Sequence, residues 1–386
     1  MKVLIALTYY QPHKSGLTVY AVRQARALAE LGHEVTVLTS QYDRSLPTSE
    51  ISDGVKVIRV PVAFRLSKGV VMPLMPLKAW QLIGDVDVVN LHVPQMDAAL
   101  LATLSKLRMK PVVLTYHCDL QMPAGLFNQL AGWAANLANR ISAALADTIV
   151  HNTRDFAEHS PFLQRYLDKL TVIQPPIIGT PVEDSDLENF RRKYEIKPGR
   201  RIIGMVARLA TEKGVEYLAQ AIPAVLEAQP EAQVVYVGEY QHVFGEQAYR
   251  EKLLPMIDAL GDHWTFLGVV SEAEKSAFYH VCEVLVLPSI NSTESFGMVQ
   301  VEALTCGTPV VATDLPGVRQ PVRTTGLGKI VPVKDAPALG EAILKLLESN
   351  IRVDPENIRA ITAHYAPQTV AEAYDALYRK LTEAHG

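Results

Sequence analysis

Short apolar runs alternate with amphipathic helical segments along the chain, and the alternation restarts in its second half. Val3–Ala6 predicts a strand, residues 15–31 predict a helix that stops at Gly32, and Val35–Leu38 predicts the next strand. Two strands joined by a helix favour parallel pairing, with the helix crossing one face of the sheet. Because the pattern begins again at Ile202–Ala207, the sequence predicts an α/β fold with a parallel sheet in each half.

The length of 386 residues suits two domains, each large enough for a hydrophobic core of its own. Residues 174–186 are rich in proline and acidic side chains and are the best candidate for a linker. We therefore expect a first domain over residues 1–175, a linker over 176–186, a second domain over 187–365 and a closing helix within 366–386.

Composition and charge exclude several classes of protein. The net charge of −4 argues against a nucleic-acid partner. Three cysteines without metal-ligand spacing fit a reducing compartment, and no apolar stretch approaches the roughly 20 residues of a membrane span. The opening residues 1–7 have no cleavage site after them and predict a buried strand rather than a signal peptide, so we expect a cytoplasmic protein.

The charge is unevenly distributed. Residues 1–175 hold 17 Lys and Arg against 13 Asp and Glu, whereas the remainder holds 20 against 28. Within the first part, residues 54–84 contain five basic residues and no acid, interleaved with apolar side chains. That composition suits peripheral contact with an anionic membrane surface or with a lipid-phosphate acceptor. A loop and a helix that cover the core, with solvated lysines, would have the same composition.

Residues 291–309 combine two glutamates, a glycine turn and a helix start in one short segment. A strand is predicted just before it, at Val284–Leu287, and a helix over Met298–Thr305. In a parallel sheet this loop lies at the carboxyl edge, where the helix N-terminus attracts anions. Glu294 and Glu302 lie eight residues apart, and a carboxylate accepts hydrogen bonds well from the hydroxyls of a sugar or a ribose.

This segment, with Phe-Gly between the glutamates and Gly-x-Pro-Val-Val-Ala after them, resembles the signature of a known family. The family is that of the retaining nucleotide-sugar glycosyltransferases of the GT-B fold, the fourth family of the carbohydrate-enzyme classification. The resemblance implies two Rossmann-like domains facing a cleft, with the donor on the second domain and the acceptor on the first. It also implies that the closing helix crosses back to the first domain.

Two cations are expected to hold the donor diphosphate. Arg208 and Lys213 flank a tight loop between a predicted strand end and a helix N-terminus, where side chains and backbone N–H groups can clamp phosphates. Either residue alone would more often be a solvated surface charge, but the pair resembles the arginine and lysine of the family. With both cations present, we expect no metal ion and no other cofactor to be required.

Two histidines follow neighbouring predicted strands of the first half, His92 and His117. Either could be a structural histidine or could position a hydroxyl at neutral pH. His117 matches the position of a histidine that the family keeps near the sugar, so we favour it as functional. Gly16, ahead of the first helix, lets a substrate approach the backbone, and the resemblance implies a contact with the donor phosphate or the acceptor.

The resemblance also implies the remaining roles. His117 and Glu294 are the expected catalytic residues, and Glu302 is expected to bind the ribose. Sugar contacts are implied for Glu294, Phe296 and Gly297; phosphate contacts for Gly16, Arg208, Lys213, Met298 and Val299; and a backbone contact with the base for Val270. The expected donor is a UDP-hexose such as UDP-glucose, and the expected acceptor is an envelope polysaccharide, a lipid-linked glycan or a small molecule.

Other functions stay open at this point. A GT-B epimerase or phosphorylase would share the fold, and a non-catalytic protein could bind the same nucleotide sugar. An NAD-dependent oxidoreductase is disfavoured, because the first strand–helix turn lacks the G-x-G-x-x-G fingerprint. Asp85 and Asp87 form an Asp-x-Asp pair, but they precede a strand of the first half and are interpreted as structural rather than as metal ligands.

Overall fold

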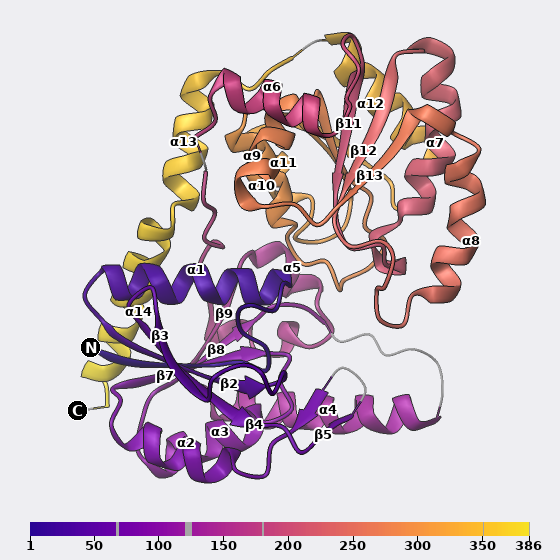
Figure 1. Ribbon diagram of the computed structural model, residues 1–386. Helices are drawn as coiled ribbons and strands as arrows, with labels where there is room; N and C mark the ends of the chain where they lie inside the picture. Colours follow the sequence, from indigo (N-terminus) through magenta and orange to yellow (C-terminus); the bar gives the residue numbers. More distant parts are fainter. Residues whose placement is uncertain (67–68, 120–125, 180, 350, 386) are drawn as a thin grey trace. The chain divides into compact units, whose positions relative to one another are not determined.

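The computed structural model describes residues 1–66, 69–119, 126–179, 181–349 and 351–385. The chain divides into two compact units, each with its own sheet (Figure 1). The first unit contains Met1–Pro176 and Tyr365–Gly386, and the second contains Ile177–His364. The end of the chain therefore belongs to the same unit as its beginning.

The first unit is built on an eight-stranded sheet in the order β10-β9-β8-β7-β1-β2-β4-β3. All neighbours in it pair in parallel except β3 and β4. Its strands are β1 (Lys2–Ala6), β2 (Glu34–Gln41), β3 (Ser49–Ser52), β4 (Val55–Pro61), β7 (Val88–Val93), β8 (Val112–Tyr116), β9 (Thr148–His151) and β10 (Leu170–Val172), and a separate hairpin is formed by β5 (Phe64–Leu66) and β6 (Gly69–Val71). Its helices are α1 (Gly16–Glu30), α2 (Met75–Gly84), α3 (Ala98–Leu107), α4 (Leu126–Leu145), α5 (Arg154–His159) and α14 (Pro367–Glu383), with short 3₁₀ turns at Leu163–Arg165 and Leu167–Lys169.

The direction of the crossovers sorts the helices of this unit into two layers. The connection through α1 moves from β1 toward the β3 edge, whereas those through α2, α3 and α4 move toward the β10 edge. Because parallel crossovers are right-handed, helices on opposite courses cover opposite faces of the sheet. Figure 1 shows this arrangement, with α1 on one face and α2, α3 and α4 on the other. Buried apolar side chains of the sheet, α2 and α3 form one continuous core.

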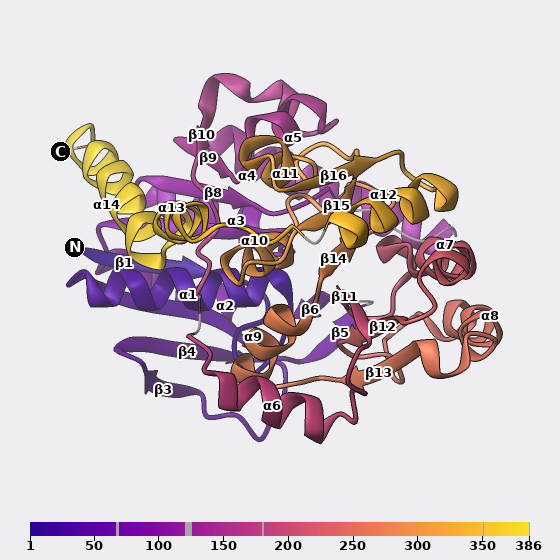
Figure 2. The ribbon, with the colours of Figure 1, turned by 90° about the horizontal axis from the view of Figure 1, so that it is seen from above.

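Helix α14 packs beside α1 through a buried polar network (Figure 2). The hydroxyls of Tyr374 and Tyr20 lie 2.9 Å apart, and Asn90 Nδ2 donates to the hydroxyl of Tyr378 at 2.8 Å. Thr115 Oγ1 donates to Asn90 Oδ1 at 2.8 Å, so the network reaches the central strands β7 and β8. All five side chains are buried, and such groups are costly to leave without partners, so the network fixes α14 to this unit.

The segment 54–84 is not the continuous surface that its composition suggests. Its first part is β4, which lies inside the sheet between β2 and β3. Arg59 is buried there, with its guanidinium 2.5 Å from Glu50 Oε1, and cannot reach a membrane. A hairpin signal was missed, because Asp53-Gly54 joins β3 to β4 with positive φ at both residues, as a type I′ turn requires. Exposed large apolar side chains occur at Phe64 on β5 and, later in the segment, at Leu74, Leu77 and Trp80.

The second unit is a six-stranded, wholly parallel sheet in the order β13-β12-β11-β14-β15-β16. Its strands are β11 (Arg201–Val206), β12 (Ala232–Val237), β13 (Trp264–Gly268), β14 (Val284–Leu287), β15 (Val310–Thr313) and β16 (Gly328–Val331). Its helices are α6 (Asp184–Lys193), α7 (Val215–Ala228), α8 (Gln247–Asp258), α9 (Glu272–Val281), α10 (Met298–Thr305), α11 (Gln320–Thr325), α12 (Ala336–Ser349) and α13 (Pro355–Tyr365), with 3₁₀ turns at Thr211–Lys213 and Gly261–His263.

The expected linker 176–186 runs into a helix. The two compact units divide after Pro176, but α6 already begins at Asp184. The acidic residues that suggested a linker form the start of this helix: Glu183 and Asp186 make a capping box, which satisfies free N–H groups of the first turn. Carboxylates at a helix N-terminus are also favoured by the helix dipole.

Candidate functional site

The sheet of the second unit changes direction between β11 and β14. From β11 the chain adds β12 and β13 on one side, and from β14 it adds β15 and β16 on the other. In parallel α/β sheets, ligands bind at the carboxyl edge of the strands at such a point. The loop after β11 carries Arg208 and Lys213, and the loop after β14 carries Glu294.

Two glycines allow these loops to pack closely. Gly214 has a φ of +63°, and a Cβ atom there would lie 2.2 Å from the carbonyl oxygen of Pro288. The Ile290 backbone N–H donates to the Glu212 carbonyl at 3.0 Å and joins the two loops directly. Gly297, with φ of +78°, has the same constraint, since a Cβ would lie 2.4 Å from Leu287 Cδ2. The positions of Gly214 and Gly297 in the sequence do not by themselves predict these close contacts.

Lys213 and Glu294 meet across the two loops. Lys213 Nζ lies 2.6 Å from Glu294 Oε2, with both side chains less than a fifth exposed. The other carboxylate oxygen accepts the Gly297 N–H at 3.0 Å. A lysine has three donors and a carboxylate about four acceptor positions, so both groups keep capacity for a ligand. The pair therefore preorganises a cation beside a hydroxyl acceptor.

Arg208 is also held by a carboxylate of its own loop. It donates to Glu212, whose side chain is largely buried, while 44% of the arginine side chain is exposed. An arginine has five N–H donors, so most of its hydrogen-bonding capacity faces outward. The sequence predicted both cations and Glu294 as site residues, but it predicted neither the pairing of Lys213 with Glu294 nor the role of Glu212. The i, i+4 spacing of Arg208 and Glu212 was the available signal for the second pair.

Helix α10 presents its N-terminus at this edge. Met298 and Val299 are its first residues, Gly297 is the cap, and Phe296 is buried beneath the loop. Gln300 holds this turn in place, because its Nε2 donates to the carbonyls of Phe296 and Val318, each at 2.9 Å. N–H groups in the first turn of a helix have no acceptor within the helix and can bind an anion.

Glu302 lies one turn further along α10 and is nearly enclosed. Tyr279 donates its hydroxyl to Glu302 Oε2 at 2.8 Å, and Lys275 Nζ lies 3.3 Å from the same oxygen. Only 6% of the glutamate side chain is exposed. The two partners come from α9 and were not predicted; the ribose-binding role of Glu302 stays a prediction. Val270 follows β13 and is also mostly buried.

In the first unit, the two predicted histidines lie together at the carboxyl edge of β7 and β8. His92 Nδ1 is 2.9 Å from His117 Nε2, and the rings are stacked. Burial lowers the pKa of His92 to about 3. Burial, followed by the neighbouring His92, places the pKa of His117 well below its usual value. Both imidazoles are therefore neutral near pH 7.

The pair has a preferred tautomer. Within the described part of the chain, His92 Nε2 is buried and has no hydrogen-bond partner. A buried N–H without an acceptor is rarer than a buried acceptor without a donor, so we assign the proton of His92 to Nδ1. His92 then donates to His117 Nε2, and His117 carries its own proton on Nδ1.

Two other residues of the first unit are placed clearly. Gly16 is the first residue of α1 and exposed, and Ser15 caps the helix by accepting the Thr18 N–H at 3.2 Å. Asp119, two residues after His117, accepts hydrogen bonds at Oδ1 from the hydroxyls of Tyr116 at 2.8 Å and Ser160 at 2.6 Å.

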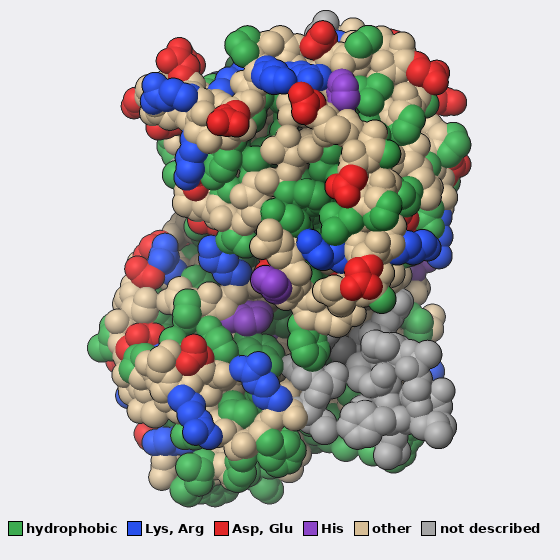
Figure 3. Space-filling model, turned by 45° about the vertical axis from the view of Figure 1, so that its right-hand side comes forward, with side chains coloured by type: hydrophobic (Ala, Val, Ile, Leu, Met, Phe, Trp, Pro, Cys, Tyr) green, Lys and Arg blue, Asp and Glu red, His purple; other side chains and the backbone are tan. Residues whose placement is uncertain are grey.

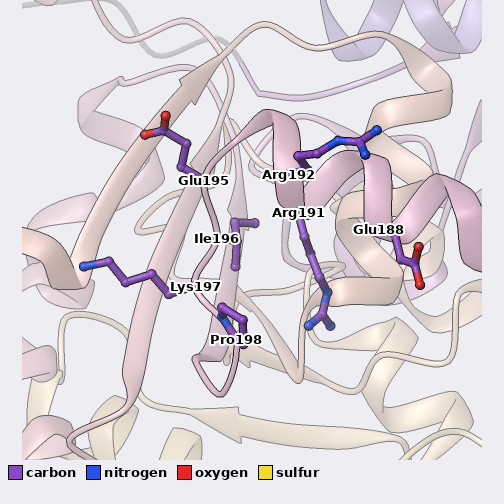
Figure 4. Close-up of a pocket in the computed structure, with 7 residues that line it drawn as sticks. All are labelled: Glu188, Arg191, Arg192, Glu195, Ile196, Lys197 and Pro198. Atoms are coloured by element: carbon purple, nitrogen blue, oxygen red, sulfur yellow. The ribbon is translucent and has the colours of Figure 1, made fainter.

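A surface hollow of about 460 Å³ lies away from these loops, at the end of α6 (Figure 4). It is lined by Glu188, Arg191, Arg192, Glu195, Ile196, Lys197 and Pro198. Figure 4 shows that the charged side chains splay apart around Ile196 and Pro198 and do not converge on one point. Among the described residues, no group of three or more His, Cys, Asp or Glu side chains is arranged to hold a metal ion.

Comparisons with known proteins agree with this geometry. The structure of Anabaena HepE in complex with UDP has the same fold, with a TM-score of 0.76, 20% sequence identity, and coverage of 99% of this chain and 100% of that one. Residues 15–176 match the Glycosyl transferase 4-like domain, and residues 186–366 match the family Glycosyl transferases group 1. The chain is a GT-B glycosyltransferase.

Two curated relatives are similar to this glycosyltransferase. One is the phosphatidyl-myo-inositol mannosyltransferase of Mycobacterium leprae, 26% identical over 91% of this chain and 88% of the relative. The other is the D-inositol 3-phosphate glycosyltransferase of Corynebacterium jeikeium, 32% identical over 53% of this chain and 49% of the relative. None of the described helices of this glycosyltransferase has the length and apolar character needed to span a bilayer.

Proposed function

We propose that this glycosyltransferase moves a hexose from a nucleoside diphosphate to an acceptor hydroxyl and retains the configuration of the anomeric carbon. The observation that carries the proposal is the group formed by Arg208, Lys213 and Glu294 at the direction change of the second sheet. Two cations beside a helix N-terminus suit a diphosphate, and the adjoining carboxylate suits sugar hydroxyls. The backbone N–H groups of Met298 and Val299 are proposed as further phosphate contacts.

In the proposed reaction, the bond between the anomeric carbon and the diphosphate oxygen breaks while a bond to the acceptor oxygen forms on the same face of the sugar. The proton of the acceptor hydroxyl passes to the leaving phosphate oxygen. Arg208 and Lys213 stabilise the negative charge that grows on the diphosphate. Because these cations are held by carboxylates before the ligand arrives, little reorganisation is needed during the reaction.

His117 is proposed to orient the reactants rather than to remove a proton. A neutral imidazole whose Nε2 accepts from His92 carries its own proton on Nδ1 and has no free lone pair with which to act as a base. Glu302 is proposed to bind the ribose, and Val270 to contact the base through its backbone.

The names of the relatives change the proposed donor and acceptor. Both relatives act, by their names, on inositol phosphates, and one is a mannosyltransferase. We therefore propose GDP-mannose ahead of UDP-glucose as the donor, and an inositol phosphate or its lipid as the acceptor. The shared chemistry is a cyclic polyol that carries an anionic phosphate, which fits the net positive charge of the first half.

The donor site can be tested with a thermal-shift panel of GDP, UDP, ADP and their sugars. A ligand at 100 times its Kd should stabilise the protein by about 2.7 kcal/mol. The stabilisation should be lost in an Arg208→Ala, Lys213→Ala double variant and kept in Lys252→Ala, which changes an exposed lysine on α8. Full stabilisation of the double variant would refute the phosphate site.

Transfer itself is tested with labelled GDP-mannose or UDP-glucose and inositol 3-phosphate or phosphatidylinositol, with anomeric analysis of the product. A product with inverted configuration would refute the proposed geometry. We expect transfer to persist in EDTA, since the two cations are proposed to neutralise the leaving group; abolition by EDTA and recovery with a divalent ion would show that they do not suffice.

A further inference from the structure

One face of the first sheet carries a line of polar side chains at the level of its central strands. They are Asn90 and His92 on β7, Thr115 on β8, and His117 directly after β8, and they alternate with the apolar residues that form the core on the other face. His92 and Thr115 are partners in the register of the two strands. The histidine pair and the buried network that holds α14 therefore lie on the same face of the sheet.

Tyr20 on α1 connects the network with the histidine pair. Its hydroxyl lies 2.9 Å from the hydroxyl of Tyr374 on α14. Its ring packs edge-to-face with the ring of His117, with centres 5.0 Å apart and planes at 86°. The same ring lies 5.9 Å from that of His92, also in an edge-to-face arrangement. Because Tyr20 is buried, its contact with α14 fixes the ring that packs against His117.

The side chain of His117 needs support from its neighbours. Its backbone N–H donates to the Val93 carbonyl at 3.0 Å, which fixes the backbone but leaves the imidazole free to rotate about its side-chain bonds. His117 is partly exposed, whereas His92 is fully buried. Histidine side chains form only small, separate patches on the face that Figure 3 shows. A substrate can therefore contact His117, and His92 acts only through another residue.

We propose that Tyr20 and His92 are positioning residues for His117, and that through Tyr20 the last helix of the chain takes part in the sugar transfer. His92 sets the tautomer, because its Nδ1–H leaves His117 Nε2 as an acceptor. Tyr20 sets the plane of the His117 ring, because an edge-to-face contact is lost when either ring turns. The role rests on the proposed function, in which His117 orients the reactants.

Two variants of His92 separate the hydrogen bond from the volume of the ring. The amide of His92→Asn can donate from nearly the same place as Nδ1, so kcat should stay within about threefold of the wild type. His92→Leu has no donor and should lower kcat by about 30- to 100-fold, with the KM for the donor within about twofold. Equal kcat values for the two variants would overturn the role of His92.

NMR of nitrogen-labelled histidine reports the tautomer directly. The His117 signals are assigned by their loss in His117→Gln. The proton should be on Nδ1 in the wild type and in His92→Asn, and should move to Nε2 in His92→Leu, where that nitrogen has lost its donor. A His117 proton on Nε2 in the wild type would contradict the proposal.

Two tyrosines of α14 give a matched pair for the connection through Tyr20. Tyr374→Phe and Tyr378→Phe each remove one buried hydroxyl from the same helix, but the first contacts Tyr20 and the second contacts Asn90. Tyr374→Phe should lower kcat by about 5- to 10-fold and change the His117 signals, and Tyr378→Phe should change kcat by less than about twofold. Tyr20→Phe loses the same hydrogen bond as Tyr374→Phe and should have a similar effect. Equal losses of kcat in the two α14 variants would mean that α14 has only a structural role.

Thermal shifts with GDP and UDP separate this inference from the proposed function. They should be unchanged in all of these variants, since the substituted residues lie in the first unit and Arg208 and Lys213 lie in the second. A wild type that transfers no sugar would refute the proposed function. The NMR signals would still decide the positioning roles, because unchanged His117 signals in both His92→Leu and Tyr374→Phe would overturn them.

Discussion

The contact between Lys213 and Glu294 gives a sharp test of the site, because it joins two loops and is proposed to serve both stability and ligand binding. Lys213→Met removes the ammonium group and keeps the length of the side chain. The Glu294 carboxylate, which is less than a fifth exposed, then loses its contact with Lys213 and keeps the hydrogen bond from the Gly297 N–H. Losing one partner of a mostly buried charged group costs about 1–3 kcal/mol in the free energy of unfolding.

A double-mutant cycle isolates the pair. Glu294→Gln keeps an oxygen for the Gly297 N–H and removes the charge, so each single variant should be less stable than the wild type and the double variant should lose less than the sum. We expect a coupling free energy of about 1–2 kcal/mol, measured by urea unfolding without ligand. The exposed pair Lys197–Asp262, with side chains 66% and 77% exposed, is the control and should show no measurable coupling.

The same variants separate stability from binding. Lys213→Met should weaken the affinity for the nucleoside diphosphate by about 10- to 100-fold in calorimetry, since a charge-assisted hydrogen bond to phosphate is lost. Glu294→Gln should leave the affinity for the diphosphate nearly unchanged and weaken that for the nucleotide sugar. A coupling near zero, together with unaltered affinities, would refute the view that this pair organises the donor site.

Three further outcomes follow from geometry already described. Gly214→Ala should destabilise the second unit by about 2–4 kcal/mol, because a Cβ would collide with the Pro288 carbonyl. Gly245 has a φ of +80° and open space around it, so the control Gly245→Ala should cost about 1 kcal/mol. Equal losses of the two variants in urea unfolding would contradict this. His92 has a lowered pKa of about 3, so the unfolded chain binds a proton there below pH 6.5 and the folded chain does not. As the pH falls from 6 to 4, His92 should contribute a loss of stability of up to about 1.4 kcal/mol per pH unit, beside the contributions of His117 and His151, whose pKa values are lowered as well. His92→Asn should therefore reduce the slope of stability against pH without abolishing it. Tyr374→Phe should cost about 1–3 kcal/mol by leaving buried hydroxyls without a partner, and a Tyr217→Phe control on α7 should cost little; matching losses would mean that the network does not stabilise α14.

Much of the fold could be predicted because the buried strands of both sheets are strongly apolar runs in the sequence. The predicted strand at Val284–Leu287 and the predicted helix at Met298–Thr305 have the bounds found in the structure. A strand with mixed composition was missed at Val55–Pro61, where Lys56 and Arg59 interrupt the apolar run. The Asp53-Gly54 turn would have revealed that strand.

At the site, the sequence predicted which residues share a loop. It did not predict which side chains from distant segments contact them. Arg208 and Lys213 lie on one loop by sequence, but the contact of Lys213 with Glu294 spans 81 residues. Glu302 was expected to face a ligand, and its neighbours Lys275 and Tyr279 come from another helix. The spacing of the residues in the sequence does not predict either contact, because each depends on how two separate elements pack together. On α4, Trp133, Leu137 and Ile141 lie four residues apart and are 64%, 43% and 41% exposed. Their exposure has the same origin, because an apolar periodicity does not say whether that side of a helix meets the core.

The return of α14 to the first unit has a consequence during synthesis. Tyr374 and Tyr378 lie on α14, which follows the second unit in sequence. They can therefore form their hydrogen bonds with Tyr20 and Asn90 only after residues 177–364 have left the ribosome. Until then the first unit exposes the surface that α14 will cover, while the second unit is contiguous and can fold as soon as it emerges. The later-made unit therefore reaches its final structure first, and chaperone binding to nascent chains should persist until the last helix is released.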